Sequence, residues 1–328
     1  MSPRIQGGGD IALPTEGAIL SKIETALENA IEQRGLEASE SPVKRQKYLY
    51  LAVDEFANDG EDPITYSWFK WGASALAGPS GPDTGKTFRT NNAEAEPLIQ
   101  TSLPEYEEFF LDGPHDLALE DWWEADFLDF LQQFYSESAP PQYQELYLDN
   151  IRLLKIIDDI EHAMFYERDP AREDTYDEVC ELTADIKGEV LIHSEFENDY
   201  EIVSDFTALL EDVVMSLVDV SEDDLIKGHQ TAISELRDHY TNHVWLILAH
   251  NMSLSTATGP NSGDIYNSSP SELSALRDRF ESEHNTKREI CKSVGLIPDL
   301  SDYKTESSDF EEKASQFLQV GEGRSSAE

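Results

Sequence analysis

The sequence predicts a mainly α-helical protein in which a small N-terminal helical domain precedes an antiparallel helical bundle. Apolar residues recur every three or four positions over most of the chain, which is the spacing of an amphipathic helix. In the C-terminal half, long segments with this spacing follow one another through short turns, as antiparallel helices do in a bundle. Hydrophobic residues make up 39% of the 328 residues, which is enough to form sizeable cores.

The N-terminal domain, residues 1–137, is predicted to contain four helices and a loop. Gly35 is a stop signal for the first helix, because glycine readily adopts the left-handed conformation that ends helices. Ser41 and Pro42 form an N-cap and first-turn pair that opens the second helix. The helices are predicted around residues 19–31, 42–56, 98–111 and 119–135, with a Gly- and Pro-rich loop at 72–92.

The bundle, residues 138–255, is predicted to consist of four long amphipathic helices after a linker at 136–141. The fourth helix spans about 222–251. The apolar stripes contain Tyr143, Tyr147, Leu154, Ile157, Ile160 and Met164; Val179, Leu182, Ile186 and Val190; Ile202, Phe206, Leu209, Val213 and Leu217; and Ile226, Ile233, Leu236, Tyr240, Val244 and Ile247. Residues 256–328 are predicted to contain loop, a short helix from Ser271 to Val294 and a polar tail.

The segment 119–135 is unusually aromatic for a surface helix. Its large side chains are Trp122, Trp123, Phe127, Phe130, Leu131, Phe134 and Tyr135. Such a stripe can dock into the groove of a partner protein, but it is more often part of the core.

The chain carries 67 acidic and 24 basic residues, a formal net charge of −43. The acids are spread over nearly every segment, which indicates adaptation to a solvent rather than a local acidic site. Molar salt reduces the Debye length to about 3 Å and so screens the self-repulsion. The composition therefore resembles that of haloarchaeal-type acidic proteins. It also excludes duplex nucleic acid as an expected partner, since phosphate binding needs a basic face.

Localisation is predicted to be cytoplasmic. The two cysteines, Cys180 and Cys291, lie far apart and lack metal-ligand spacing, as in a reducing compartment. Residues 1–20 show no secretory signal, and the apolar run 244–249 is too short to span a bilayer, so no membrane association is expected.

Two motifs suggest chemistry. The segment 81–87 approaches a phosphate-binding loop but lacks its first glycine and the following apolar helix. Helical spacing places His239, His243 and His250 on one face, with Glu235 beside them. These four side chains are candidate metal ligands, or half-buried residues at the edge of the apolar stripe. We expect no cofactor and no catalytic residue.

Lys44, Arg45 and Lys47 concentrate three of the 24 basic residues within four positions. They lie in the first turn of a predicted helix, where positive charge opposes the helix dipole. Two interpretations remain open: a specific binding role, or pairing with acids of the same chain.

The same helix carries a family resemblance. Its sequence S-P-V-K-R-Q-K-Y-L-Y-L-A, residues 41–52, resembles the opening helix of the Panacea (SocA-like) antitoxin domain, and G60, P63-I64-T65 and W68-F69-K70-W71-G72 follow in the family's order. The resemblance ends at Ala73, where the family usually has proline. It implies a mainly helical, non-catalytic module that neutralises a toxin or delivers a partner to a protease. Carried over to this chain, the matching residues are Lys44, Gln46, Lys47, Tyr50, Trp68 and Lys70.

The sequence thus favours an antitoxin-like protein–protein interaction protein that is not an enzyme, with a possible toxin as its partner. The first alternative is a metal-binding bundle or metal-dependent enzyme that uses His239 and His243. The second is a structural protein without chemistry of its own. The sequence leaves open the partner's identity, an activity of the bundle and the oligomeric state.

Overall fold

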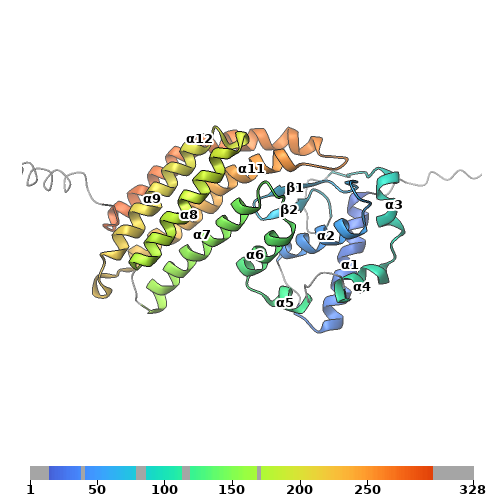
Figure 1. Ribbon diagram of the computed structural model, residues 1–328, viewed down its shortest axis with the longest axis horizontal. Coiled ribbons are helices and arrows are strands. Elements are labelled where there is room, and N and C mark those ends of the chain that lie inside the picture. The colour runs from blue at the N-terminus through green and yellow to red at the C-terminus, as the bar shows by residue number, and fades with distance from the viewer. Residues whose placement is uncertain (1–14, 38–40, 79–85, 113–118, 168–170, 298–328) are drawn as a thin grey trace, which may run out of the picture.

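The computed structural model describes residues 15–37, 41–78, 86–112, 119–167 and 171–297. It confirms the predicted mainly α-helical fold. The N-terminal helices gather at one end of an elongated molecule, and the helices of the C-terminal half lie side by side at the other end (Figure 1). A small β-hairpin lies between the two groups (Figure 1). Among the described helices, none combines the length and the hydropathy that crossing a lipid bilayer requires.

The N-terminal helices are α1 (Glu16–Arg34), α2 (Pro42–Phe56), α3 (Asn92–Gln100), α4 (Leu103–Asp112), α5 (Leu119–Glu124) and α6 (Phe127–Ser138). The predicted boundary signals of the first two helices are confirmed. Gly35 ends α1 in the left-handed conformation with φ 68°. Ser41 caps α2, because its hydroxyl accepts a hydrogen bond from the backbone N–H of Lys44 at 3.4 Å.

The segments 98–111 and 119–135 were each predicted to form one continuous helix. This prediction is wrong, because each segment is divided between two shorter helices. The first is interrupted before Leu103, where the backbone N–H of Ser102 donates to the Glu105 carboxylate at 2.6 Å. This contact satisfies a donor that a new helix start leaves unpaired. The second is interrupted at Ala125 and Asp126, between α5 and α6.

The hairpin consists of β1 (Tyr66–Phe69) and β2 (Gly72–Ala75), which pair antiparallel with Tyr66 opposite Ala75. The loop predicted from residue 72 is wrong for 72–75, because these residues form β2. Four-residue strands are too short to show a clear alternation of apolar and polar residues, so the pairing depends on tertiary contacts. Part of the predicted loop, 79–85, lies outside the described residues.

The bundle is formed by α7 (Gln144–His162), α8 (Glu173–Ile192), α9 (Tyr200–Val218), α10 (Lys227–His239), α11 (Trp245–Thr256) and α12 (Gly263–Ser293). Wide π-helical turns follow α7 at Ala163–Glu167 and join α10 to α11 at Tyr240–Val244. Short 3-10 turns lie at Ser194–Phe196 and Glu222–Asp224. The predicted short helix 271–294 is wrong in its start, because α12 begins at Gly263 and has 31 residues. It packs on α9, α10 and α11, so the bundle continues past residue 255.

The predicted stripes of the bundle are largely buried, although Ile226 is 54% exposed. The aromatic segment 119–135 belongs to the core: Trp122, Phe130 and Phe134 are buried. The main core runs without interruption from α1 to α12 and crosses the predicted boundary at 137/138. The hairpin joins the two parts, since the backbone N–H of Trp68 donates to Thr256 Oγ1 at 2.8 Å and the Trp245 indole donates to the Lys70 carbonyl at 2.6 Å.

Gly259, in the turn after α11, is expected to tolerate no side chain. It has φ 89°, and a Cβ there would lie 2.4 Å from the Ile64 carbonyl oxygen. We expect Gly259→Ala to lower the free energy of unfolding by about 1–3 kcal/mol. Gly188→Ala is the matched control, because a Cβ in the interior of α8 meets open space; it is expected to stabilise by about 0.5–1 kcal/mol. Thermal unfolding of both variants checks this, and equal shifts of Tm would contradict it.

Candidate functional site

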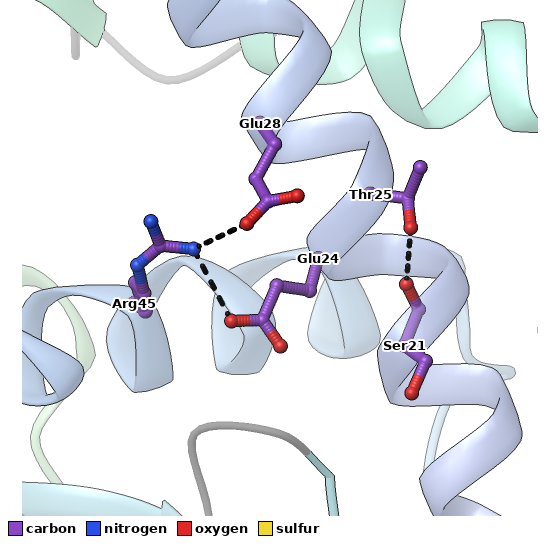
Figure 2. Close-up of polar contacts among 5 residues, drawn as sticks. All are labelled: Ser21, Glu24, Thr25, Glu28 and Arg45. Atoms are coloured by element: carbon purple, nitrogen blue, oxygen red, sulfur yellow. Dashed lines mark hydrogen bonds and ion pairs between the residues drawn. The ribbon is translucent and has the colours of Figure 1, made fainter. Parts of the chain in front are cut away.

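The basic segment at the start of α2 makes its contacts within the chain. Figure 2 shows the Arg45 guanidinium reaching from α2 to two carboxylates of α1, with Nη1 3.3 Å from Glu24 Oε1 and 2.9 Å from Glu28 Oε1. Lys44 and Lys47 instead donate to backbone carbonyls. Lys44 Nζ lies 2.9 Å from the Trp123 oxygen and Lys47 Nζ lies 2.6 Å from the Ala73 oxygen. Contacts within the chain therefore account for all three cations. Only Arg45 forms ion pairs with carboxylates, whereas the two lysines bind backbone carbonyls.

Lys44, Gln46 and Lys47 are buried, so their side chains hold the fold together and present no outer contact surface. Gln46 Oε1 accepts a hydrogen bond from the backbone N–H of Ala75 at 3.0 Å, and Lys47 binds the neighbouring Ala73. The two side chains together attach α2 to the second strand of the hairpin. Burial lowers the pKa of Lys47 to about 7 and also lowers the pKa of Lys44, which the nearby Asp126 partly offsets.

Lys70 is half-buried and lies at the turn of the hairpin. Its ammonium donates to Asn242 Oδ1 at 2.9 Å and lies 5.5 Å from the centre of the Trp71 ring. Burial lowers the pKa of Lys70, against the opposing effect of Asp238. Lys70 and Lys47 both line a small pocket of about 200 Å³ beside the hairpin. Of the residues carried over from the resemblance, only Tyr50 and Trp68 line the larger pocket described next.

This larger pocket, which we call the junction pocket, has a volume of about 420 Å³. Four segments that are distant in the sequence meet around it: the end of α2 with the loop after it, strand β1, the turn between α6 and α7, and the end of α11. It lies where the N-terminal helices meet the bundle. Its lining residues are Tyr50, Val53, Asp54, Ala57, Asn58, Asp59, Gly60, Glu61, Asp62, Pro63, Ile64, Tyr66, Trp68, Pro140, Gln142, Thr256 and Thr258.

Three aromatic rings form one corner of the junction pocket. The Tyr50 ring stands nearly perpendicular to the Tyr66 ring, with centroids 5.4 Å apart, and to the Trp68 ring, with centroids 5.7 Å apart. Trp68 is fixed from behind by stacking on Phe134 at 5.6 Å. This packing keeps the rings in place without a ligand, because each ring is held by its neighbours.

Carboxylate side chains also line the junction pocket, and they belong to Asp54, Asp59, Glu61 and Asp62. Burial, aided by the negative charges of Asp54 and Asp62, raises the pKa of Tyr50 to about 12. The Asp62 carboxylate also accepts a hydrogen bond from the Thr258 hydroxyl, which connects the loop after α2 to the end of α11. The Tyr66 hydroxyl is buried and has no hydrogen-bond partner among the described residues. The lining of the pocket thus combines aromatic side chains with carboxylates.

The structure does not bring the four candidate metal ligands together at one point. Glu235 pairs with Lys287, and His250 packs against Phe69 with ring centroids 4.8 Å apart. The π-helical turn Tyr240–Val244 changes the helical phase between His243 and His250, which is why regular spacing misplaced them. No group of three or more His, Cys, Asp or Glu side chains within the described ranges is arranged to hold a metal ion.

His239 and His243 do lie together, with ring centroids 5.1 Å apart, and His284 of α12 joins them at 5.6 Å from His239. Burial, aided by these two neighbouring imidazoles, lowers the pKa of His239 to about 3. His239 is therefore neutral at ordinary pH and packs as part of the bundle interior. Sequence reasoning missed His284, because nothing in the local pattern indicates that α12 packs on α10.

Sequence reasoning also missed the junction pocket as a site. Its acidic loop, 58–62, carries no recognisable motif, and the end of α11 lies beyond the predicted fourth helix of the bundle, which ends at about residue 251. The acidic residues of this loop did not indicate a site, because a fifth of all residues in the chain are acidic. The aromatic run 66–71 was the one usable signal, since so many aromatic residues between turns indicate a buried or binding segment.

Comparison with known proteins identifies a family. A family model described as a domain of unknown function, DUF8098, matches residues 10–110 and 105–320. The chain belongs to this family, since the match covers most of its length. No curated protein and no solved structure matches the chain.

Proposed function

We propose that this member of the DUF8098 family is a non-catalytic protein-binding protein of antitoxin-like type, which neutralises a partner protein or delivers it to a protease. The observation that carries the proposal is the junction pocket at the edge of the Panacea-like segment. Of that segment's matching residues, Lys44, Gln46 and Lys47 serve its internal packing. Tyr50 and Trp68 line a preformed cavity.

The packing of the segment supports a binding role. The contacts from α2 to the hairpin and from the hairpin to α11 give the pocket walls a fixed position. A preformed site loses little conformational entropy when a partner binds, so more of the contact energy contributes to affinity. Aromatic side chains at such a site are typical of residues that dominate protein–protein binding.

The proposed environment is a reducing cytoplasm at molar salt. The net charge of −43 supports the salt requirement, because only a short Debye length makes such a charge compatible with a compact fold. Cys180 and Cys291 are free thiols in the structure, which fits a reducing compartment. Measurements of binding and stability therefore belong in molar KCl.

The test is co-expression with a small open reading frame that neighbours this gene. We expect the neighbour's product to arrest growth when expressed alone, and the full chain to restore growth and to co-elute with that product in molar KCl. Tyr50→Leu is expected to weaken the rescue, because it opens the aromatic corner of the pocket. Tyr266→Leu is the matched control, since this tyrosine is exposed on α12 and lies outside the pocket.

Two outcomes would contradict the proposal. The first is growth arrest that co-expression does not relieve, together with separate elution of the two proteins. The second is stoichiometric metal in protein purified at molar salt, retained by the parent chain and lost in His239→Ala. That result would favour the metal-binding alternative, in which His239 and His243 are ligands.

A further inference from the structure

We propose that the contact between α10 and α12 is a pH-sensitive latch, which is closed while its histidines are neutral and opens when they take up protons. Four of the eight histidines of the chain lie at this contact or in the π-helical turn that continues α10: His229, His239, His243 and His284. The proposal goes beyond the binding of a partner protein and does not depend on it, because it concerns the packing of the bundle alone.

Three of these histidines form a cluster of rings whose buried nitrogens lack hydrogen bonds. His239 is 1% exposed, and its ring lies 5.8 Å from that of Phe206 and 5.4 Å from that of Phe280, between centroids. Both nitrogens of His239, with Nδ1 of His243 and of His284, have no partner among the described residues. A protonated imidazole has two N–H donors and a positive charge. Proton uptake therefore adds a charge and a donor where the closed contact offers no acceptor.

His229 makes the contact depend on a neutral ring in a second way. Its Nε2 lies 3.0 Å from the carbonyl oxygen of Val294, directly after α12, so this nitrogen is the donor. Its Nδ1 accepts a hydrogen bond from the backbone N–H of Ile226 at 3.5 Å, at the start of α10. A protonated ring carries a hydrogen on both nitrogens and cannot accept. Protonation of His229 therefore breaks the bond to Ile226.

The charged groups that face the three clustered rings come from α9, α10 and α12. They are Asp205 of α9, Glu235 of α10, and Arg279, Glu283, Lys287 and Arg288 of α12. Half of them are cations, and Glu235 is already paired with Lys287. Burial, aided by the neighbouring imidazoles and Lys287, lowers the pKa of His239 to about 3. Burial also lowers the pKa of His243 and of His284.

The sign of the pH effect follows from these lowered pKa values. A histidine in contact with water has a pKa of about 6.5. Below this pH the opened contact binds more protons than the closed contact, so the closed contact loses stability as the pH falls. At neutral pH and above, both states are unprotonated at these rings, and the latch stays closed.

The latch acts on the C-terminal half of α12. The N-terminal half is held by other contacts: Leu273 and Leu276 pack on Ile247 of α11, and Arg277 pairs with the buried Asp199 of α9. These contacts contain no imidazole. We therefore expect acid to release residues 280–293 from the bundle while residues 263–277 stay in place.

Amide hydrogen exchange of the full chain tests the proposal, in molar KCl with a chelator, at pH 7.5 and at pH 5.0. After correction for the chemical exchange rate, the opening constant of amides in 280–293 is expected to rise at least about thirtyfold. This is the factor for one proton taken up 1.5 units below a pKa of about 6.5. Amides in 263–277 are the internal reference and are expected to change much less.

Variants locate the proton uptake. His239→Phe keeps an aromatic ring against Phe206 and Phe280, and we expect it to lessen the acid-driven rise by at least about tenfold. His229→Gln keeps a donor and an acceptor that do not titrate, so it is also expected to lessen the rise and tests the proposal if His239→Phe does not fold. His162→Phe is the matched control, because this exposed histidine at the end of α7 lies outside the latch.

Three results would overturn the proposal. The first is exchange in 280–293 that does not respond to acid. The second is an equal response in 263–277, because the opening would then not be confined to the latch. The third is a rise in His239→Phe and in His229→Gln as large as that in the parent and in His162→Phe.

Discussion

Asp199→Asn is expected to lower the free energy of unfolding by about 3–5 kcal/mol, because it leaves a largely buried guanidinium without its counter-charge. Asp199 is fully buried at the start of α9 and binds Arg277 of α12 through two hydrogen bonds of 2.6 Å. The same carboxylate accepts a third hydrogen bond of 2.6 Å from Asn251 of α11. One side chain thus joins three helices of the bundle.

Urea unfolding in molar KCl measures this loss. Asp129→Asn is the matched control, since it breaks an ion pair of 2.5 Å with Lys155 in which the aspartate is exposed. Exposed pairs contribute about 0–1 kcal/mol, so the control is expected to unfold at nearly the parent midpoint. Similar losses in both variants would show that the buried network does not hold the bundle together.

Lys47→Met is expected to remove a pH-dependent change of several kcal/mol in the free energy of unfolding. Burial lowers the pKa of Lys47 from 10.5 to about 7, and each pKa unit corresponds to about 1.4 kcal/mol. Between pH 7 and 10.5 the unfolded chain binds more protons at this position than the folded chain does. Its contribution therefore makes stability rise with pH over this interval and stay constant below pH 7.

The measurement compares urea unfolding of the parent and of Lys47→Met from pH 6 to 9.5 in molar KCl. The difference between the two curves isolates this lysine, because every other titrating group is shared. We expect the difference to grow in favour of the parent as pH rises above 7. The lost hydrogen bond to Ala73 adds only a constant offset. Parallel curves would mean that the ammonium stays charged in the interior.

The boundary signals of α1 and α2 were predictable because they are local. Gly35 and the pair Ser41 and Pro42 act through their own backbone geometry and through hydrogen bonds to residues a few positions away. The interruption before α4 was also visible in principle, since Ser102 and Glu105 have capping-box spacing and Pro104 lies in the first turn of the new helix. These signals were outweighed by the apolar spacing that runs through 98–111.

The length of α12 was not predictable in this way. Pro270 and the polar residues before it are typical of a loop, yet the helix continues through them. Ile265, Leu273 and Leu276 bury their side chains, the last two against Ile247 of α11, and this packing compensates for the missing backbone donor. Local propensity is a weak predictor wherever tertiary contacts of this kind oppose it.

By itself, the sequence determined the helical class, most of the helix faces and the buried aromatic character of 119–135, because helical periodicity and capping depend on residues only a few positions apart. Only the tertiary structure decided which faces meet. It buried Lys44 and Lys47, separated His250 from His239, and placed Trp68 beside Thr256, 188 positions along the chain. The junction pocket arises from such long-range contacts, since a repeating pattern specifies which side of a helix is apolar but not which other helix covers it.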